Sequence, residues 1–472
     1  MTNALAESHY LRGNALRSAG HFVQAGTALR EALLLDPTHR DAAYSLAYML
    51  REHGSVYAAA DTVSEWAAHA EPAQDEVLAA LGFLLECDAL TRAHALARAA
   101  RTRWPDDARL AARAGEIALA LGEFDEATQS LREALDRDPN LSAAWLRLAH
   151  CRRHAQIDDP DLHRFERGWA DAKLTPLART CAGFALGKAL DDLGAYARAA
   201  DVLRAANLRV HTSSPWSRVA WRDGIAAQLA AAPLPAVPTQ PDFVPVFIIG
   251  LPRSGTTLIA STLGSFEDVR DRGELNWIPA LHAHLREQGQ LHDARALAQI
   301  AELVRAQMRR DDAPARCYVD KNPLNFRYLD FILALFPNAR IVHCRRDLRD
   351  TALSLWMQHF AGEDMGFSHD FADIARVARD CDALIAHWRH RGVEMLDLDY
   401  EAFVAAPDLQ RTRLAEFIGV DARAFALNDP TVCDVVKTAS VWQVRQPVHT
   451  RSIRRWRHYV SYLPELATLF PE

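Results

Sequence analysis

A short segment in the second half of the chain places the strongest constraint on its fold. Residues 244–249 form an apolar, β-branched run that breaks at Gly250 and Pro252, and a helix-compatible stretch begins at Thr256. A strand, a tight loop and a helix in this order present backbone N–H groups and a helix N-terminus to one point, a geometry that binds phosphate groups. The sequence therefore predicts an α/β unit with an anion site at this loop.

The loop has the spacing Gly250-x-x-x-x-Gly255-Thr-Thr, which is close to that of the Walker A loop of P-loop NTPases. In those proteins a lysine follows the second glycine and reaches the β- and γ-phosphates of the nucleotide. Here Thr256 occupies that position, so the loop is better suited to a single 5′-phosphate. A nucleotide kinase or NTPase is the alternative enzyme class, and the lack of a clear Walker B pairing disfavours it.

The segment Pro252-Arg-Ser-Gly-Thr-Thr257 resembles the 5′-phosphosulfate loop of sulfotransferases that use 3′-phosphoadenosine-5′-phosphosulfate (PAPS). It is most similar to the loop of the tyrosylprotein sulfotransferase branch and of sulfotransferases that contain tetratricopeptide (TPR) repeats. The resemblance covers about Phe243 to Trp456 and implies PAPS as the donor, with no catalytic metal. It also implies that the 5′-phosphate is bound by Arg253, Ser254, Gly255, Thr256 and Thr257.

The same resemblance implies two catalytic residues. Glu274 matches the family's acidic base without a gap from Arg253, and a hydroxyl acceptor needs such a base because its protonated form is a poor nucleophile. Cytosolic small-molecule sulfotransferases use a histidine instead, but His282 and His284 come too late in the chain to match. Lys321 directly follows a predicted strand and corresponds to the lysine that stabilises the leaving phosphate.

Arg346 and Ser354 match the family pair that binds the 3′-phosphate, the group that distinguishes PAPS from ATP. Arginine suits this role because its planar fork meets phosphate oxygens bidentately. Tyrosylprotein members carry a further arginine four residues after the serine, where this chain has Gln358. Weaker matches to the cofactor site are Tyr400, Ser440, Arg445 and Arg451, and positive charge also gathers at Arg454, Arg455 and Arg457.

The first half of the chain repeats. Prolines recur at intervals of 33 to 35 residues, at Pro37, Pro72, Pro105 and Pro139. A period near 34 residues, with small residues where paired helices touch, resembles the TPR helix-turn-helix unit. The pattern fades over residues 151–176 and returns around Gly187. The alternative is a non-repetitive, alanine-rich helical bundle.

These patterns predict three regions: a TPR α-solenoid over 1–230, a proline-rich linker over 231–242, and a P-loop-like, parallel-sheet α/β sulfotransferase domain over 243–472. Helix-length stretches at 257–263, 324–336 and 349–359 should cover both faces of the sheet. Strands are expected at 246–249, 317–319, 340–344 and 393–398. The acceptor pocket is expected from loops 275–312 and 361–370.

Charge and cysteine usage narrow the function further. The formal net charge of −7 disfavours a general nucleic-acid-binding protein. Seven scattered cysteines without metal-ligand spacing favour a reducing compartment. Without a signal peptide or a membrane-length apolar run, the sequence predicts a cytoplasmic protein with no membrane partner.

The predicted function is transfer of a sulfuryl group from PAPS to an acceptor hydroxyl on a protein tyrosine, a sugar or a small molecule. The TPR region is expected to bind the acceptor or another protein partner through its concave surface. A non-catalytic TPR adaptor is the remaining alternative. It is disfavoured because Arg253, Glu274 and Lys321 are all retained.

Overall fold

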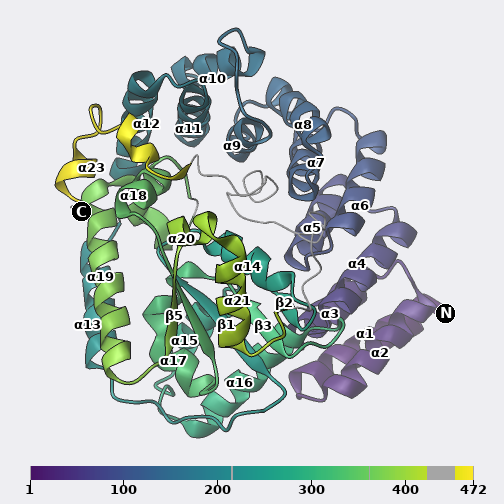
Figure 1. Ribbon diagram of the computed structural model, residues 1–472. Coiled ribbons are helices and arrows are strands. Elements are labelled where there is room, and N and C mark those ends of the chain that lie inside the picture. The colour runs from purple at the N-terminus through teal and green to yellow at the C-terminus, as the bar shows by residue number, and fades with distance from the viewer. Residues whose placement is uncertain (1, 214–215, 361, 423–451, 471–472) are drawn as a thin grey trace. The chain divides into compact units, whose positions relative to one another are not determined.

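A computed structural model describes residues 2–213, 216–360, 362–422 and 452–470 of the chain (Figure 1). By its backbone contacts the chain divides into two compact units. The first comprises Met1–Arg137 and Glu302–Pro314, and the second comprises Asp138–Ala301 and Ala315–Glu472. The predicted boundaries of the linker, 231 and 242, stay a prediction.

The first unit contains helices that follow one another as antiparallel pairs (Figure 1). Their inner faces are rich in alanine and leucine, and these residues form its cores. The helices are α1 (Thr2–Ser18), α2 (Phe22–Leu35), α3 (Arg40–Glu52), α4 (Val56–Ala70), α5 (Gln74–Glu86), α6 (Leu90–Arg103), α7 (Ala108–Leu121) and α8 (Phe124–Arg137).

A glycine allows the two helices of a hairpin to approach closely, and this contact recurs along the chain. A Cβ added to the glycine would lie 2.5–2.7 Å from a leucine side chain on the paired helix, closer than real Cβ atoms come. In each case the leucine lies at the same spacing after the glycine, which confirms the repeat read from the sequence. The pairs are Gly13 with Leu29, Gly115 with Leu131, and Gly187 with Leu203.

Residues 302–314 belong to the first unit although they lie far along the chain. The Gln307 side chain donates hydrogen bonds to two carbonyls at the end of α3, at 2.6 and 2.8 Å. The Asp311 carboxylate accepts the backbone N–H groups of Tyr57 and Ala58 at 2.8 Å each. These N–H groups begin α4, so Asp311 supplies the cap that the start of a helix requires.

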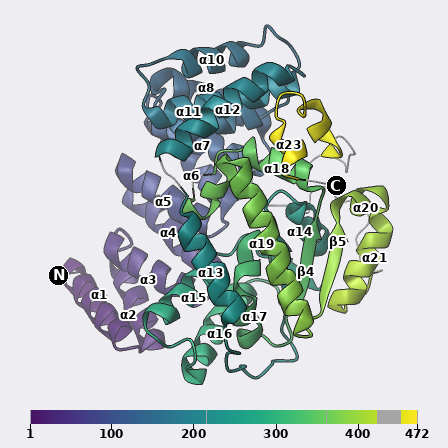
Figure 2. The ribbon, with the colours of Figure 1, turned by 90° about the vertical axis from the view of Figure 1, so that its left-hand side faces the viewer.

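The second unit begins with five helices that pack in the same unit as the sheet. Asn207 donates to the backbone carbonyl of Trp356 at 2.9 Å, and the Trp221 indole donates to Asp380 at 2.8 Å. The second bond joins helices that run side by side in Figures 1 and 2. The helices are α9 (Ser142–His150), α10 (Pro160–Ala170), α11 (Pro176–Asp192), α12 (Tyr196–Ser213) and α13 (Arg218–Ala230).

The sheet has five strands in the order β2-β3-β1-β4-β5, and every neighbouring pair is parallel. The central strand pairs on both sides, with Val246 opposite Val319 in β3 and opposite Arg340 in β4. Four strands match those predicted; β2 is a short addition that the sequence did not suggest. The strands are β1 (Val244–Gly250), β2 (Val269–Asp271), β3 (Cys317–Asp320), β4 (Arg340–Arg345) and β5 (Met395–Asp399).

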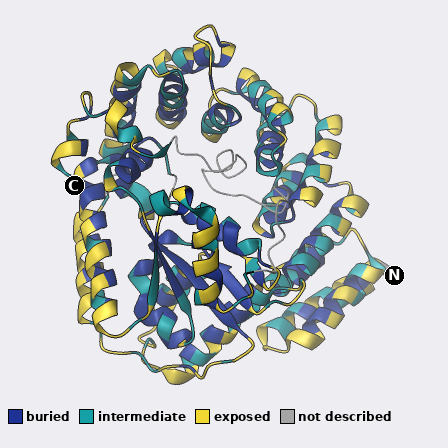
Figure 3. Cartoon of the chain, in the orientation of Figure 1, coloured by how far each residue is buried: buried dark blue, intermediate teal, exposed yellow. Residues whose placement is uncertain are grey.

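Helices cover both faces of this sheet, as predicted. On one face Val246 and Ile248 share a buried core with Ile259 of α14 and Leu414 of α21. On the other face Phe247 stacks against Phe336 with ring centroids 6.5 Å apart. In Figure 3 the central strands β1 and β3 and most of β4 are dark blue, whereas the outer sides of α19 and α21 are yellow, so the core lies along the middle of the sheet.

The remaining elements follow the strands or connect them. None of the helices that the structure describes is both long enough and apolar enough to span a bilayer. The elements are α14 (Thr256–Gly264), α15 (Trp277–Glu287), α16 (Ala294–Arg309), η1 (Pro323–Tyr328), α17 (Leu329–Leu335), α18 (Leu348–Trp356), η2 (Glu363–His369), α19 (Phe371–His390), α20 (Tyr400–Ala405), α21 (Pro407–Ile418), η4 (Arg455–His458) and α23 (Glu465–Thr468).

Candidate active site

The carboxyl ends of the five parallel strands place most of the predicted site residues along one edge of the sheet. Residue 251 starts the predicted phosphate loop after β1, and the other positions follow their strands within one to three residues. Ligands of open parallel sheets bind at this edge. The residues that follow the strands are Glu274 after β2, Lys321 after β3, Arg346 after β4 and Tyr400 after β5.

The phosphate loop has the backbone of an anion-binding turn. Arg253 and Gly255 adopt positive φ angles of 72° and 99°, and Gly255 is the N-cap of α14. The first N–H groups of a helix have no partner within it, and a glycine cap offers them no side chain. Ser254 is buried and its hydroxyl donates to the carbonyl of Leu251 at 2.7 Å, which fixes the loop. Thr256 and Thr257 open the helix at this point.

The neighbouring Tyr400 also requires a glycine at position 255. A Cβ at this position would lie 2.7 Å from Cδ2 of Tyr400, which is closer than real Cβ atoms come. Tyr400 is the first residue of α20, so this contact brings the start of that helix against the phosphate loop. The structure thus brings together two residues that the sequence assigned to the nucleotide site from motifs 145 residues apart.

Arg253 is the centre of the charged part of the site. Its Nε donates to the hydroxyl of Ser354 at 3.0 Å. Burial, and then the positive charges of Arg346 and Arg455, lower the pKa of Arg253 to about 10, whereas Glu274 and Tyr400 act in the opposite direction. One side chain therefore interacts with groups that follow three other strands, β2, β4 and β5, and with the C-terminal segment.

Arg346 is fixed by backbone carbonyls. Its Nη1 donates to the carbonyl of Arg253 at 3.0 Å, and its Nη2 donates to the carbonyl of Ser452 at 2.7 Å. The guanidinium lies over the ring of Tyr400, 4.8 Å from the centroid. Among the residues that the structure describes, the buried Nε of Arg346 has no hydrogen-bond partner. A buried donor without an acceptor is costly, so this site suits an anionic ligand.

A cavity of about 400 Å³ opens beside these groups. Leu251 and Ser254 of the phosphate loop line it, together with Arg346 and Thr351. The buried hydroxyl of Thr351 likewise has no hydrogen-bond partner among the described residues. The cavity therefore presents two unpaired polar groups next to the loop.

Glu274 and Lys321 form an ion pair between Oε1 and Nζ. Lys321 is 2% exposed and Glu274 is 49% exposed, so the carboxylate faces solvent while the ammonium lies beneath it. The backbone holds both in place, because the Lys321 N–H donates to the carbonyl of Gly273 at 2.8 Å. The N–H of Leu275 also donates to Asp320 at 3.3 Å, and burial raises the pKa of Asp320 to about 8.

His282 and His284, the histidines that lie near Glu274 in the sequence, occupy different environments. His282 is 7% exposed and packs between Tyr328 and Phe331, with ring centroids 5.1 and 5.4 Å away. Burial lowers the pKa of His282 to about 4, so it is a neutral core residue at pH 7. His284 is exposed.

Gln358, which replaces an arginine of the resembling family, has a partner from the helical region. Its side chain hydrogen-bonds to His150 at the end of α9. Burial, Lys188 and Arg253 together lower the pKa of His150 to about 3, which keeps the imidazole neutral at pH 7. Sequence reasoning missed His150, because a lone histidine at a helix end carries no motif.

Three predicted cofactor residues, Ser440, Arg445 and Arg451, lie outside the residues that the structure describes. From the same arginine-rich segment, Arg455 interacts electrostatically with Arg253 and Arg346. The sequence indicated Arg455 only as part of a run of positive charge. Its ion-pair partner is Asp191 of α11, for which the sequence gave no signal.

The geometry agrees with the comparisons to known proteins. Residues 245–424 match the model of the sulfotransferase family, and residues 6–39 and 108–141 match that of the tetratricopeptide repeat. The resemblance read from the sequence is thereby confirmed. The fold class is a region of TPR repeats followed by a parallel-sheet α/β sulfotransferase domain.

Individual relatives cover different parts of the chain. An uncharacterized protein of Aquifex aeolicus is 25% identical over 99% of this chain and 70% of its own length. The protein-tyrosine sulfotransferase of Drosophila melanogaster is 32% identical over 45% of this chain, which spans only 46% of that protein. The sulfotransferase domain of the Synechococcus PCC 7002 olefin synthase is 20% identical, with a TM-score of 0.31 over 48% of this chain and 98% of that domain.

Proposed function

We propose that this protein is a PAPS-dependent sulfotransferase that sulfates an acceptor hydroxyl. The observation that carries the proposal is the arrangement around Arg253. This one guanidinium bonds to Ser354 and interacts electrostatically with Arg346, Arg455 and Glu274. A cluster of cations next to a solvent-facing carboxylate is what a polyanionic donor and a hydroxyl acceptor require together.

The residues present fit such a donor. The N–H groups at the start of α14, with Thr256 and Thr257, can receive the 5′-phosphate, where the helix dipole favours an anion. Arg346 and Ser354 are assigned to the 3′-phosphate, and the unpaired Nε of Arg346 is a donor suited to it. When bound, the donor supplies the sulfuryl group and leaves as 3′-phosphoadenosine-5′-phosphate (PAP).

Glu274 and Lys321 divide the chemistry between them. Glu274 takes the proton of the acceptor hydroxyl as the oxygen–sulfur bond forms. Lys321 stabilises the negative charge that develops on the departing phosphate oxygen as the original sulfur–oxygen bond breaks. Their ion pair holds the base and the cation in direct contact, so both can act on the same transferring group.

The first experiment is isothermal titration of the full-length protein with PAP and with ATP. We expect PAP to bind much more tightly, because only PAP carries a phosphate for Arg346 and Ser354. Equal or tighter binding of ATP would favour the kinase or NTPase class instead. Absence of binding to both would favour the non-catalytic adaptor.

The acceptor is proposed to be a tyrosine in a protein, with sugars and small phenols as alternatives. The support is the similarity to proteins named protein-tyrosine sulfotransferases. Mass spectrometry of cell extract incubated with the enzyme and PAPS tests this directly. A sulfated peptide carrying the mass on tyrosine supports the proposal, and a sulfated glycan or metabolite overturns this part of it. The cytoplasmic location stays a prediction from the sequence.

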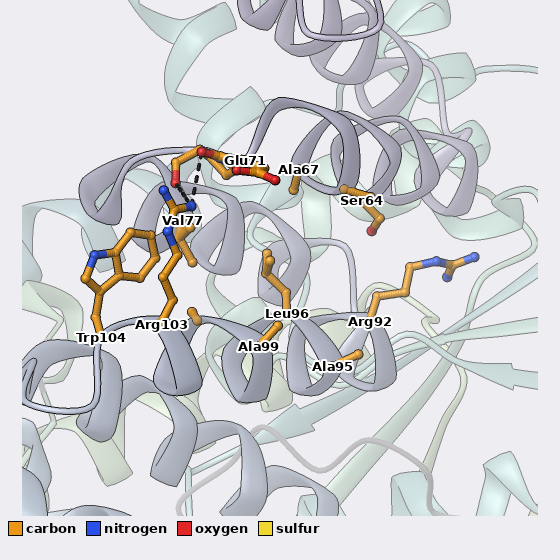
Figure 4. Close-up of a pocket in the computed structure, with 13 residues that line it drawn as sticks. Ser64, Ala67, Glu71, Val77, Arg92, Ala95, Leu96, Ala99, Arg103 and Trp104 are labelled. Carbon is orange, nitrogen blue, oxygen red and sulfur yellow. Dashed lines mark hydrogen bonds between the residues drawn. The ribbon is translucent and has the colours of Figure 1, made fainter.

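The TPR region is proposed to bind the acceptor or a protein partner. It contains a cavity of about 580 Å³ with lining residues from α4 and α6 (Figure 4). Buried Val77 and Ala67 belong to its apolar lining. Leu96 and Trp104 add larger apolar surfaces, and Arg103 donates to the carbonyls of residues 71 and 72.

A variant within this cavity tests the recruiting role. Ala99 is an exposed lining residue of α6, so Ala99→Glu puts a carboxylate into the cavity without disturbing a buried contact. We expect lower sulfation of the natural acceptor and unchanged affinity for PAP. Thr102→Glu changes another exposed position of α6, one that does not line the cavity, and serves as the control. Equal acceptor turnover in both variants would contradict a role for the cavity.

A further inference from the structure

The guanidinium of Arg455 is held by a residue from the helical region. Its Nη2 forms an ion pair with Asp191 Oδ2, a contact between residues 264 positions apart. The other oxygen of Asp191 accepts the hydroxyl of Tyr459 at 2.7 Å. Asp191 is 10% exposed and Arg455 is 28% exposed, so the carboxylate is largely enclosed whereas the arginine remains partly open.

The backbone that carries Arg455 is fixed by a separate set of contacts. Asp350 of α18 accepts the N–H of Arg454 at 2.6 Å and the N–H of Trp456 at 2.9 Å. Arg349 lies over the Trp456 ring, 4.2 Å from its centroid. These bonds set the position of the main chain but leave the direction of the Arg455 side chain to Asp191.

Arg455 lies on the side of the site that is assigned to the 3′-phosphate. Its Nη2 lies 3.5 Å from the sulfur of Met357, which follows Ser354 by three residues. Burial lowers the pKa of both Arg253 and Arg346, and the positive charge of Arg455 acts on each in the same direction. On Arg455 itself, Asp191, Tyr459 and Asp192 favour the charged form, against the effect of burial.

We propose that Asp191 is a positioning residue for donor binding, which directs the Arg455 guanidinium toward the 3′-phosphate of the nucleotide. The inference rests on the proposed function and extends it. Helix α11, which precedes the proline-rich segment, then sets the affinity for the donor as well as packing against the sheet-containing part of the unit. The alternative is that the Asp191 carboxylate competes with the phosphate for Arg455 and so weakens donor binding. The experiment below separates these two effects.

The test is isothermal titration of full-length Asp191→Asn with PAP and with adenosine 5′-monophosphate, which lacks the 3′-phosphate. A contact between a charged donor and phosphate contributes about 1.5–3 kcal/mol, so its loss corresponds to about ten-fold or more in affinity. We expect PAP binding to weaken by about this factor and binding of the monophosphate to change by less than about two-fold. A general loss of structure would weaken both nucleotides alike.

Matched variants tie the effect to Arg455. Glu465→Gln removes another carboxylate that pairs across the same unit, with Arg204 of α12, and should leave both affinities unchanged. In the background of Arg455→Gln, the Asp191→Asn change should have no further effect on the ratio of the two affinities. Asp191→Glu should restore part of the PAP affinity.

A second variant keeps the test available if Asp191→Asn does not fold. Tyr459→Phe removes one bond to Asp191 and should shift the ratio of PAP affinity to monophosphate affinity in the same direction by less.

Each contrary result has one meaning. If the parent binds PAP and Asp191→Asn binds it equally or more tightly, the positioning role is wrong and tighter binding shows competition. Equal weakening of PAP and the monophosphate also overturns it, because the role is then structural only. If the parent itself does not bind PAP, the proposed function fails before this inference is reached.

Discussion

The two ends of the candidate site are built in different ways. The reactive end, Glu274 and Lys321, joins residues 47 positions apart that follow neighbouring strands. The proposed nucleotide end comprises Arg253, Arg346, Ser354 and Arg455. Counting the bond from Arg455 to Asp191, it joins segments that lie 93 to 264 positions apart.

The two ends therefore depend on different parts of the fold. Backbone hydrogen bonds between the loops after β2 and β3 hold the reactive end, so the pairing of two strands is enough to form it. The nucleotide end needs the loop after β1, the start of α18, the C-terminal segment and α11 to pack correctly at once. Affinity for the donor should therefore respond to distant changes, whereas the chemical step should respond to local ones.

The largest effect should come from the reactive end. Glu274→Gln keeps the shape of the side chain and removes its ability to take a proton, and loss of a general base costs about 10²–10⁴ in rate. We expect turnover to fall by this factor with PAP affinity unchanged, and the melting temperature to fall because the buried Lys321 ammonium loses its anionic partner. Glu287→Gln, at an exposed position of α15, is the control. Turnover within a few-fold of the parent would show that another group takes the proton, and the exposed His284 would be tested next.

At the nucleotide end, Arg346→Ala should weaken PAP binding by about ten-fold or more, because it removes a charge-assisted contact of about 1.5–3 kcal/mol. Turnover at saturating donor should change much less, which is the reverse of the pattern for Glu274→Gln. Arg340→Ala is the control, since that side chain lies at the start of β4, is 41% exposed and pairs with Glu394. PAP affinity equal to that of the parent would contradict the placement of the nucleotide.

Two glycine variants test whether the nucleotide end depends on distant packing. Gly187→Val would overpack the contact with Leu203 in the hairpin that carries Asp191, and Gly115→Val would do the same to Leu131 in the first unit. Overpacking costs about 1–3 kcal/mol, so thermal unfolding should show a lower Tm for the affected unit in both variants. Only Gly187→Val should also reduce PAP affinity. Equal PAP affinity in the two variants would contradict the dependence on α11.

The smallest effect should come from one hydroxyl of the phosphate loop. Thr257→Val keeps the side-chain shape and removes one hydrogen bond that a neutral hydroxyl donates to the 5′-phosphate. The backbone N–H groups of α14 remain as donors, so the loss should stay near the lower limit of about 1.5 kcal/mol for a bond to a charged group. We expect a loss of PAP affinity of about ten-fold or less in titration. Thr262→Val is the control on the same helix, because the Thr262 hydroxyl already donates to the carbonyl of Leu258. A loss of equal size in the control would show an effect on helix α14 itself.

Much of this molecule could be predicted from local sequence. The order of strand, loop and helix at residues 244–258 fixed the phosphate loop, because an apolar run, glycines and a helix start act on neighbouring residues. Lys321, Arg346 and Tyr400 directly follow strands, so parallel pairing alone brings them to one edge. The proline period and the small residues where paired helices touch likewise indicated the helical hairpins.

Other features depended on packing between distant segments. Strand β2 has three residues, of which only Val269 is apolar, so no run marked it, and it forms because β3 offers an edge to pair with. The partners of Gln358 and Arg455, His150 and Asp191, lie in a helical region whose sequence resembles the other repeats. A sequence pattern reports which face of a helix is buried, but the charge that a side chain meets across an interface is decided only when the two surfaces fold together.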